Sequence, residues 1–361
     1  MKFDFCIGNP PYQEEAESQS KTNNQKPRKN IFHYFQIQAD KIAEEGSVMI
    51  YPGGRWIQQS GKGLKEFGHN QINDKTLSSV VLYADSKEVF GSAADLADGV
   101  SIVVKNKKKT NEGFNYKYIN HNEIAETQLD FPGDGIIPLD PRDKIISDKI
   151  ISGVKKHDLS LLNNRILPRS LFSIESDFVE NNPSKAELYN ESSSYDWNKV
   201  VKVLTNDKAG KAGRAKWFVI DKSEIKTGIQ FLDKWKVIVS SANAGGQKRD
   251  NQLEIADNHS AFGRARVALG SFETKSEAEN FYKYAKSTVI KYAFLLTDEA
   301  LTSLGKAVPD ICDYSDKNEL LDFSKDIDMQ LCEILSLTDQ DFSYITKRVD
   351  AVWGNRQKEM A

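Results

Sequence analysis

The sequence predicts an α/β fold in its first part and a mixed α+β domain in the rest. Over the first part, short apolar runs alternate with helical patterns and with glycine or proline turns. A lysine-rich stretch at residues 105–111 ends this alternation, and mixed short strands and loops follow. At 361 residues the chain also exceeds one typical domain. We therefore predict domains at residues 1–110 and 111–361.

The elements of the first domain follow from periodicity and from breaking residues. Residues 3–7 form a short apolar run that ends at Gly8-Asn9-Pro10-Pro11, as a buried strand would. Residues 31–43 carry apolar side chains at helical spacing, and Gly46 is expected to close that helix. A short helix is expected at 62–69, and further strands at 47–51, 79–83 and 100–104. Strands that alternate with helices favour a mainly parallel sheet.

In the second domain the clearest elements are a strand at 234–240 and helices at 275–294 and 326–349. Thr274 is placed to cap the first of these helices. Glu273-Thr274-Lys275 is similar to part of a nuclease carboxylate site, but no Pro-Asp partner precedes it at a suitable place. We interpret it as the start of a helix.

Composition excludes few functions. The net charge is only -3 with 28% charged residues, which neither supports nor excludes DNA binding, because a basic face is what matters. Three distant cysteines and five scattered histidines form no metal-ligand spacing, so we predict no metal site. Few free thiols are typical of the reducing cytoplasm, where we expect the protein. No apolar run approaches the length of a membrane span, and we expect no membrane partner.

The sharpest signal is Asn9-Pro10-Pro11-Tyr12, directly after the strand at residues 3–7. In open α/β sheets, ligands bind at the carboxyl ends of strands. One reaction that such a turn could serve is methylation of the exocyclic amine of adenine. That amine is a poor nucleophile because its lone pair is conjugated with the ring. The side-chain oxygen of Asn9 and the carbonyl of Pro10 can accept its two hydrogens, and the fixed angles of the prolines stiffen the turn. The ring of Tyr12 can stack on a base that has left the helix. An ordinary turn is the alternative for these four residues alone.

The segment Phe3–Gln13 resembles the catalytic motif of adenine-specific methylases of restriction-modification systems, in particular the family that combines type II and type IIG methylases. Further segments keep that family's order over nearly the whole chain: 31–35, 46–52, 55–56, 61–67, 73–74, 85–90, 98–100, 270–272, 277–280, 283–284, 308–309 and 326–328. The resemblance implies a partial Rossmann-like methyltransferase sheet followed by a target-recognition domain.

The resemblance also implies an activity: methyl transfer from S-adenosylmethionine to N6 of a flipped adenine at a specific DNA site. Asn9, Pro10, Pro11 and Tyr12 would be the catalytic residues, and Asn9 and Phe35 would border the cofactor. The partner would be double-stranded DNA.

Two departures from the family bear on this activity. The family's glycine-rich cofactor loop normally lies upstream of the catalytic motif, and no later segment supplies one; Ala209-Gly210-Lys211-Ala212-Gly213 has no strand with an acidic end before it. The strand at 99–104 carries serine and valine where relatives tend to have aromatic residues. Residues 3–7 would also form an exposed apolar edge. We therefore expect a separate N-terminal methyltransferase polypeptide to complete the sheet; a remnant of a longer gene is the alternative.

Candidate DNA contacts are basic residues in loops and in the second domain, which can reach phosphates and base edges. Solvated surface charge is the alternative for each one. The candidates are Lys26, Arg28, Lys29, Arg55, Lys62, Lys211, Arg214, Lys216, Lys248, Arg249, Arg264 and Arg266.

Two other functions stay open at this point. The chain can be a catalytically silent DNA-recognition module that keeps a remnant of the fold. It can also be the specificity part of a linked restriction endonuclease, which would then be its partner.

Overall fold

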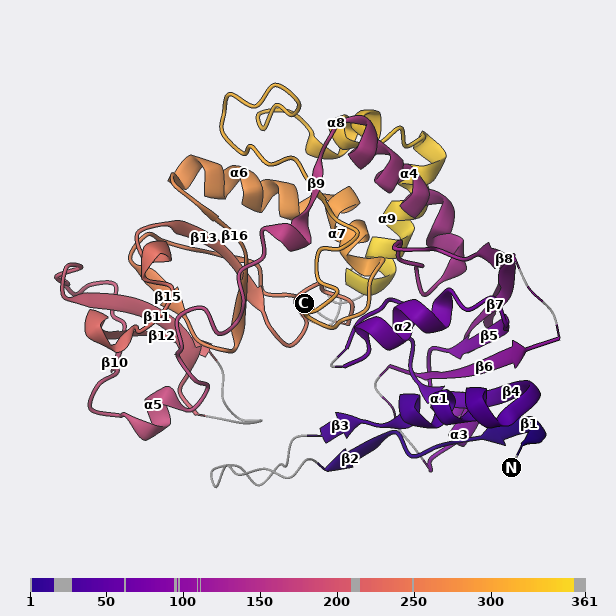
Figure 1. Cartoon of the computed structure of the whole chain (residues 1–361). Helices are drawn as coiled ribbons and strands as arrows, with labels where there is room; N and C mark the ends of the chain where they lie inside the picture. The colour runs from indigo at the N-terminus through magenta and orange to yellow at the C-terminus, as the bar shows by residue number, and fades with distance from the viewer. Residues whose placement is uncertain are drawn as a thin grey trace. The chain divides into compact units, whose positions relative to one another are not determined.

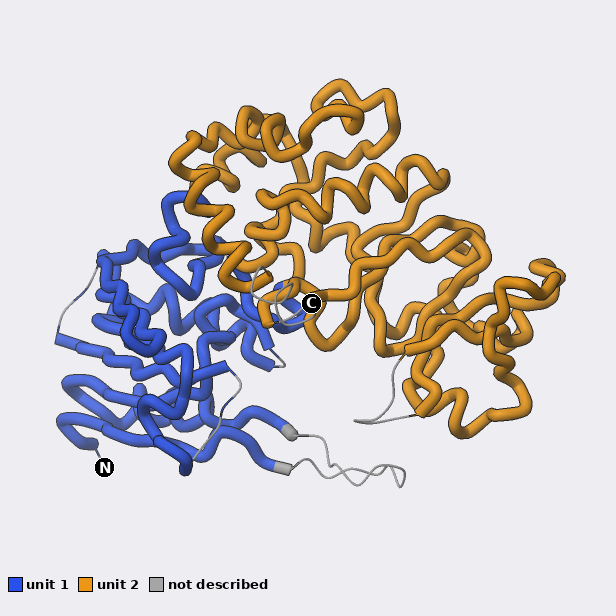
Figure 2. The backbone as a smooth tube through the Cα atoms, turned by 180° about the vertical axis from the view of Figure 1, so that it is seen from behind, with its two compact units in different colours: residues 1–147, 296–303 blue, residues 148–295, 304–361 orange. Residues whose placement is uncertain are grey.

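The computed structural model describes residues 2–15, 28–61, 63–93, 96, 98–108, 110, 112–208, 215–248 and 250–353. The chain divides into two compact units (Figure 2). Unit 1 contains residues 1–147 and 296–303, and unit 2 contains residues 148–295 and 304–361.

Unit 1 is built on a six-stranded sheet with the order β1-β4-β6-β5-β7-β8 (Figure 1). Its strands are β1 (Phe3–Gly8), β4 (Ala43–Pro52), β5 (Leu77–Tyr83), β6 (Val100–Asn106), β7 (Gly113–Asn120) and β8 (Glu123–Asp130). The pairs β1–β4 and β5–β7 are parallel, and the other three pairs are antiparallel. The sheet is therefore mixed, and the expectation of a mainly parallel sheet is wrong. The reason is that β6 runs back between β4 and β5, and that β8 returns from β7 through a short turn.

The core of unit 1 lies on one face of this sheet. Helices α1 (Phe32–Ile42), α2 (Lys65–Ile72) and the short α3 (Lys87–Phe90) connect the strands. Phe32 of α1 and Phe67 of α2 pack edge-to-face, and both contact the ring of Tyr51 in β4. Alternate residues of the paired strands, such as Met49 and Val103, are buried in the same cluster. The fold is thus mixed α/β, as the alternating pattern predicts.

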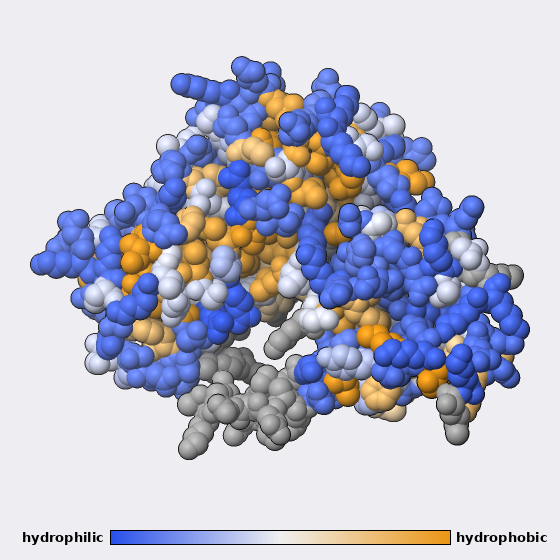
Figure 3. All heavy atoms as spheres, viewed as in Figure 1, coloured by the Kyte–Doolittle hydropathy of each residue, from blue (hydrophilic) through white to orange (hydrophobic). Residues whose placement is uncertain are grey.

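The two edges of the sheet differ in character. On β1, Phe3, Phe5 and Ile7 are 49%, 60% and 78% exposed. On β8, at the other edge, the exposed positions include Glu123, Glu126, Gln128 and Asp130. Charged residues protect a free edge from pairing, whereas an apolar edge invites it. The exposed apolar edge expected at residues 3–7 is therefore present, and Figure 3 shows apolar atoms at the surface where β1 and α1 lie in Figure 1.

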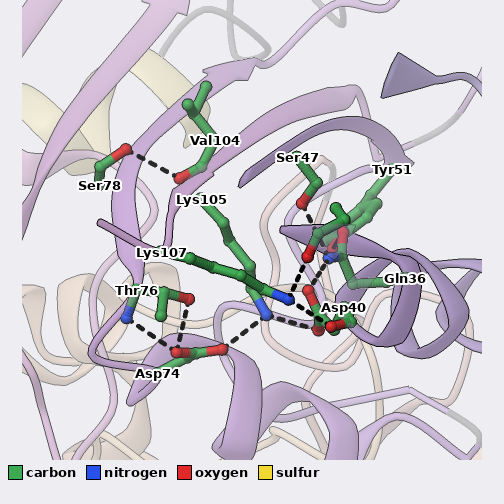
Figure 4. Close-up of polar contacts among 11 residues, drawn as sticks. Gln36, Asp40, Ser47, Tyr51, Asp74, Thr76, Ser78, Val104, Lys105 and Lys107 are labelled. Atoms are coloured by element: carbon green, nitrogen blue, oxygen red, sulfur yellow. Dashed lines mark hydrogen bonds and ion pairs between the residues drawn. The ribbon is translucent and has the colours of Figure 1, made fainter. Parts of the chain in front are cut away.

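A buried polar network holds α1 to the sheet (Figure 4). Lys105 of β6 lies between two carboxylates, with its Nζ 2.8 Å from Asp40 and 2.6 Å from Asp74. The side chain of Gln36 in α1 is fully buried; it accepts a hydrogen bond from the Tyr51 hydroxyl and donates one to Asp40. The network ties α1, β4, β6 and the turn before β5 together.

Gly46 has a different role from the one expected. Helix α1 ends at Ile42, and β4 begins at once with Ala43 in an extended conformation. Gly46 lies inside β4, where a Cβ atom would stand 2.2 Å from the carbonyl oxygen of Lys105 in β6. The glycine therefore permits the close approach of two strands and does not end the helix.

Unit 2 holds two main sheets. One has the order β10-β12-β11-β15 and the other β14-β13-β16. Their strands are β10 (Glu187–Leu188), β11 (Val200–Asn206), β12 (Ala215–Asp221), β13 (Trp235–Ser240), β14 (Glu254–Ala256), β15 (Ser260–Phe262) and β16 (Arg266–Phe272). A shared apolar core contains Val203, Ile220, Ile238 and Phe262. The strand expected at 234–240 is confirmed.

The remaining elements are mostly helical. The small pairs are β9 (Ser160–Leu161) with β17 (Pro309–Asp310) in unit 2, and β2 (Gln13–Glu15) with β3 (Arg28–Asn30) in unit 1. The helices are α4 (Lys144–Lys156), α5 (Phe178–Asn181), α6 (Lys275–Lys286), α7 (Thr288–Leu295), α8 (Ile327–Ile334) and α9 (Asp339–Trp353). Short 3-10 turns lie at Pro141–Asp143, Leu162–Asn164, Lys222–Glu224 and Ile229–Phe231.

Both long helices expected in the second domain are interrupted. The first breaks at Ser287, whose backbone is extended, and the second breaks between Ile334 and Asp339. The cap at Thr274 is confirmed: its hydroxyl accepts from the backbone N–H of Glu277, and the Glu277 carboxylate accepts from Thr274.

The boundaries of the two compact units differ from the domain boundary that we predicted at residue 110. The hairpin β7–β8 pairs with β5 and so extends the first sheet to Asp130. Unit 1 accordingly continues to Ser147, and residues 296–303 return to it from the second half of the chain.

Candidate active site

The turn Asn9–Tyr12 leaves the carboxyl end of β1. Gly8, the last residue of β1, pairs with Met49 of the parallel strand β4, so the loops that follow the two strands lie at the same edge of the sheet. Asn9 and Pro11 are exposed, whereas Pro10 is buried. The turn is thus anchored at Pro10 and presents the amide of Asn9 to solvent.

Tyr12 lies directly against Asn9. Its hydroxyl donates a 2.8 Å hydrogen bond to Oδ1 of Asn9, and its ring packs against the apolar core of unit 1. Burial raises the pKa of Tyr12 to about 12, so the hydroxyl remains protonated at neutral pH. The backbone carbonyl of Tyr12 accepts the N–H of Ile31, which joins the turn to the start of α1. The two side chains that the sequence singled out are therefore in contact.

Arg55 lies at the same edge, in the loop after β4. Its guanidinium is 2.8 Å from the carboxylate of Asp98 and 4.0 Å from that of Glu299, and its side chain is 35% exposed. The sequence analysis proposed Arg55 as a DNA contact. It could not predict the ion pair with Asp98, because Asp98 lies 43 residues away in the chain. Any contact of Arg55 with phosphate has to compete with two carboxylates.

The proposed cofactor residues are accessible. Asn9 is exposed, and Phe35 on α1 is 43% exposed. An exposed aromatic ring can contact a cationic sulfonium group. Exposure therefore leaves each of the two residues open to a ligand, and no described contact joins them.

The other basic candidates have varied surroundings. Lys29 is 3.9 Å from Glu14 and lies over the ring of Tyr34, while Lys216 is 2.5 Å from Asp207 and Arg264 is 2.8 Å from Glu175.

Lys248 is exposed, but Arg266 is buried, donates to Gln252 and has its pKa lowered by burial. For Arg28 only the backbone is described, and Lys26, Lys62, Lys211, Arg214 and Arg249 lie outside the described residues.

The sequence did not indicate the return of residues 296–303 to unit 1. Nothing in the local pattern of Leu296–Ser303 distinguishes this segment from a loop of the second domain. Its role rests on side-chain contacts with residues about 240 positions earlier in the chain, such as that of Asp298 with Gln58.

Comparison with known proteins finds a family that the first segment resembles. Residues 1–90 match the model of the Eco57I restriction-modification methylase family. The matched segment contains β1, the Asn9–Tyr12 turn, α1 and β4, and it is similar to the corresponding part of that family. No curated protein matches the chain.

Three solved structures of restriction-modification proteins match the chain at low identity and low TM-score. The type IIL enzyme MmeI in complex with DNA is 10% identical, with 96% of this chain and 57% of that chain covered and a TM-score of 0.43. The type ISP enzyme LlaGI with a DNA substrate mimic is 12% identical, with coverages of 93% and 41% and a TM-score of 0.35. The type I methyltransferase subunit from Streptococcus thermophilus is 12% identical, with coverages of 32% and 26% and a TM-score of 0.23.

The chain spans between 26% and 57% of the length of these matched structures. At such identities and TM-scores the likeness does not extend to individual residues. Across the described part of the chain, no helix is long and apolar enough to cross a membrane.

Proposed function

We propose that this chain takes part in site-specific methylation of DNA, with N6 of an extruded adenine as the acceptor and S-adenosylmethionine as the methyl donor. The observation that carries the proposal is the exposed amide of Asn9, held by a buried proline at the carboxyl end of β1. The methylase family matched by residues 1–90 agrees with this chemistry.

In the proposed mechanism Asn9 and Pro10 act on the amine of the base. The Oδ1 atom of Asn9 has two lone pairs, so it can accept one amine hydrogen whether or not the Tyr12 hydroxyl keeps its hydrogen bond to the same atom. The carbonyl of Pro10 accepts the second hydrogen, and the nitrogen lone pair becomes available as its conjugation with the ring weakens. A bound cofactor would supply the electrophilic methyl group: the N–C bond would form as the S–C bond breaks, a neutral thioether would leave, and the methylated nitrogen would lose one proton to solvent. The ring of Tyr12 supports the base by stacking.

A direct assay tests this function. The full chain is incubated with S-adenosylmethionine and unmethylated DNA, alone and together with the polypeptide encoded beside it, and the digested DNA is analysed by mass spectrometry. We expect N6-methyladenine in at least one arm. Specific DNA binding without methyladenine in either arm would indicate a silent recognition module, and cleavage only with a second chain would indicate the specificity part of a nuclease.

We further propose that a separate polypeptide, which carries the cofactor loop, adds a strand to the free edge of β1. The support is the contrast between the apolar edge at Phe5 and Ile7 and the charged edge at β8. Ile7 also shares a row of the sheet with Val48 and Val104, which are only half-buried. A partner that covers this row would bury an apolar surface that continues across three strands.

Substituting the edge tests the partner. We expect the double variant Phe5→Thr, Ile7→Thr to bind the partner at least tenfold more weakly, because burying each large apolar side chain contributes about 1.5–3 kcal/mol. Ile124→Thr on β8 is the matched control, since Ile124 is 62% exposed at the opposite edge of the same sheet. The measurement is the dissociation constant from calorimetry. Equal weakening by both variants would contradict a partner at β1.

A further inference from the structure

Residues Leu296–Ser303 cross from the second half of the chain into unit 1 and contact the loop at residues 53–61. That loop follows β4, and the Asn9–Tyr12 turn follows β1 at the same sheet edge. A contact that fixes one loop of this edge can therefore influence the other.

The first part of the loop, at residues 53–56, is held by a glycine turn and by hydrogen bonds to β6. Gly53 has a positive φ of 66°, and a Cβ there would stand 2.7 Å from the Cβ of Asp98, so only glycine fits. The fully buried Trp56 donates through its indole N–H to Ser101 at 2.8 Å, and Ser101 donates to the carbonyl of Gly53. The first residues of the loop are thus fixed on β6.

The last part of the loop, at residues 58–61, is held by hydrogen bonds to the segment Leu296–Ser303. The side chain of Gln58 has no exposed surface; it donates to the carbonyl of Leu296 at 2.9 Å and accepts the backbone N–H of Asp298 at 2.5 Å. The hydroxyl of Ser60 donates to the carboxylate of Asp298, and the N–H of Gly61 donates to Thr302 at 3.1 Å.

Asp298 is the centre of these contacts. It is 7% exposed, and besides Ser60 its carboxylate accepts from the N–H of Ala300 and from the hydroxyl of Ser303. A buried carboxylate is retained only where hydrogen bonds replace its hydration. Its neighbour Glu299 is the second carboxylate near Arg55. One short segment therefore fixes the end of the loop and supplies the more distant of the two carboxylates near Arg55.

We propose that Leu296–Ser303 positions the loop at residues 53–61 for catalysis, with Asp298 as the positioning residue. This inference rests on the proposed methylase function. The segment belongs to the half of the chain that we expect to recognise DNA, so it places a part of that half within the methylase unit. Its loss would leave Asn9 in place but free the neighbouring loop at the same edge.

A matched pair of serine variants tests the inference. Ser60→Ala removes the hydrogen bond between loop and segment, and Ser303→Ala removes one within the segment, at the same carboxylate. Both truncate a serine that is at most 1% exposed. We expect Ser60→Ala to lower kcat about tenfold with an unchanged KM for DNA, as the loss of one hydrogen bond to a charged group predicts, and Ser303→Ala to leave kcat within about threefold.

Hydrogen exchange on the full chain gives a readout that does not need activity. We expect faster exchange at residues 53–61 in Ser60→Ala than in Ser303→Ala, with DNA affinity unchanged in both. If the wild-type protein transfers no methyl group, the proposed function is wrong. The comparison of hydrogen exchange would still test whether Leu296–Ser303 positions the loop. Equal effects of the two variants on exchange, or a rise in KM without a fall in kcat, would overturn that positioning role.

Discussion

Replacing Asn9 by alanine is expected to lower the rate of methyl transfer about 100-fold or more, while the affinity for DNA changes little. The reason is that a pre-organised polar group acting on the reacting centre contributes most in the transition state, and its removal typically costs this much. Asn9 is exposed and its side chain accepts only the Tyr12 hydroxyl among the hydrogen bonds described for it, so folding should not suffer. The measurement is kcat for N6-methyladenine formation beside DNA affinity by fluorescence anisotropy.

Asn70→Ala is the matched control, because Asn70 is also exposed and lies in α2 of the same unit. It should keep both activity and affinity. A rate for Asn9→Ala within a few-fold of wild type would end the assignment of Asn9 as a catalytic residue. A parallel loss of DNA affinity would instead make Asn9 a binding residue.

The second large effect concerns stability. Lys105→Met is expected to lower the free energy of unfolding of unit 1 by about 2–3 kcal/mol, because it removes hydrogen bonds to the charged carboxylates of Asp40 and Asp74. The side chain of Lys105 is 2% exposed, but those of Asp40 and Asp74 are 31% and 30% exposed, so water can replace part of the lost interaction. Chemical denaturation followed by tryptophan fluorescence measures the change, since Trp56 is buried in this unit.

Lys108→Met is the control for this prediction. Lys108 pairs with Glu45, but its side chain is 65% exposed, and exposed pairs contribute about 1 kcal/mol or less. Similar losses for the two variants would contradict a structural role for the buried network.

The same network predicts a dependence on pH. Burial alone raises the pKa of Asp74, but hydrogen bonds from Lys105 and Thr76 outweigh it and lower the pKa below its ordinary value of 3.8. A depressed carboxyl pKa contributes stability that is present above the ordinary value and is lost as the pH falls through the folded one. Wild-type protein should thus lose this contribution below about pH 4, and Lys105→Met should lack it.

Much of unit 1 could be predicted because its signals are local. The apolar runs at β1, β4, β5 and β6, the helical spacing in α1 and the Asn9–Tyr12 turn can each be recognised within a dozen residues. The sequence singled out Asn9 and Tyr12 separately, and it did not predict the hydrogen bond from the Tyr12 hydroxyl to Oδ1 of Asn9.

The parts that could not be predicted depend on distant contacts. Gly46 was expected to end a helix because glycine does so often; its actual role depends on the carbonyl of Lys105, 59 residues later. The reversed direction of β6 has no local signal either, because strands of both directions share the same apolar pattern. The extension of the sheet by β7 and β8 shifted the end of the first unit for the same reason.

The path of the chain has a consequence for engineering. It passes between the two units after Ser147, after Leu295 and again after Ser303, so no single cut separates them. A fragment that stops at Ser147 would remove the acceptor at Leu296 and the donor at Asp298 from Gln58, and the carboxylate of Asp298 from Ser60. An exchange of unit 2 for another domain should therefore replace both of its parts, residues 148–295 and 304–361, and keep the native octapeptide at 296–303 in place.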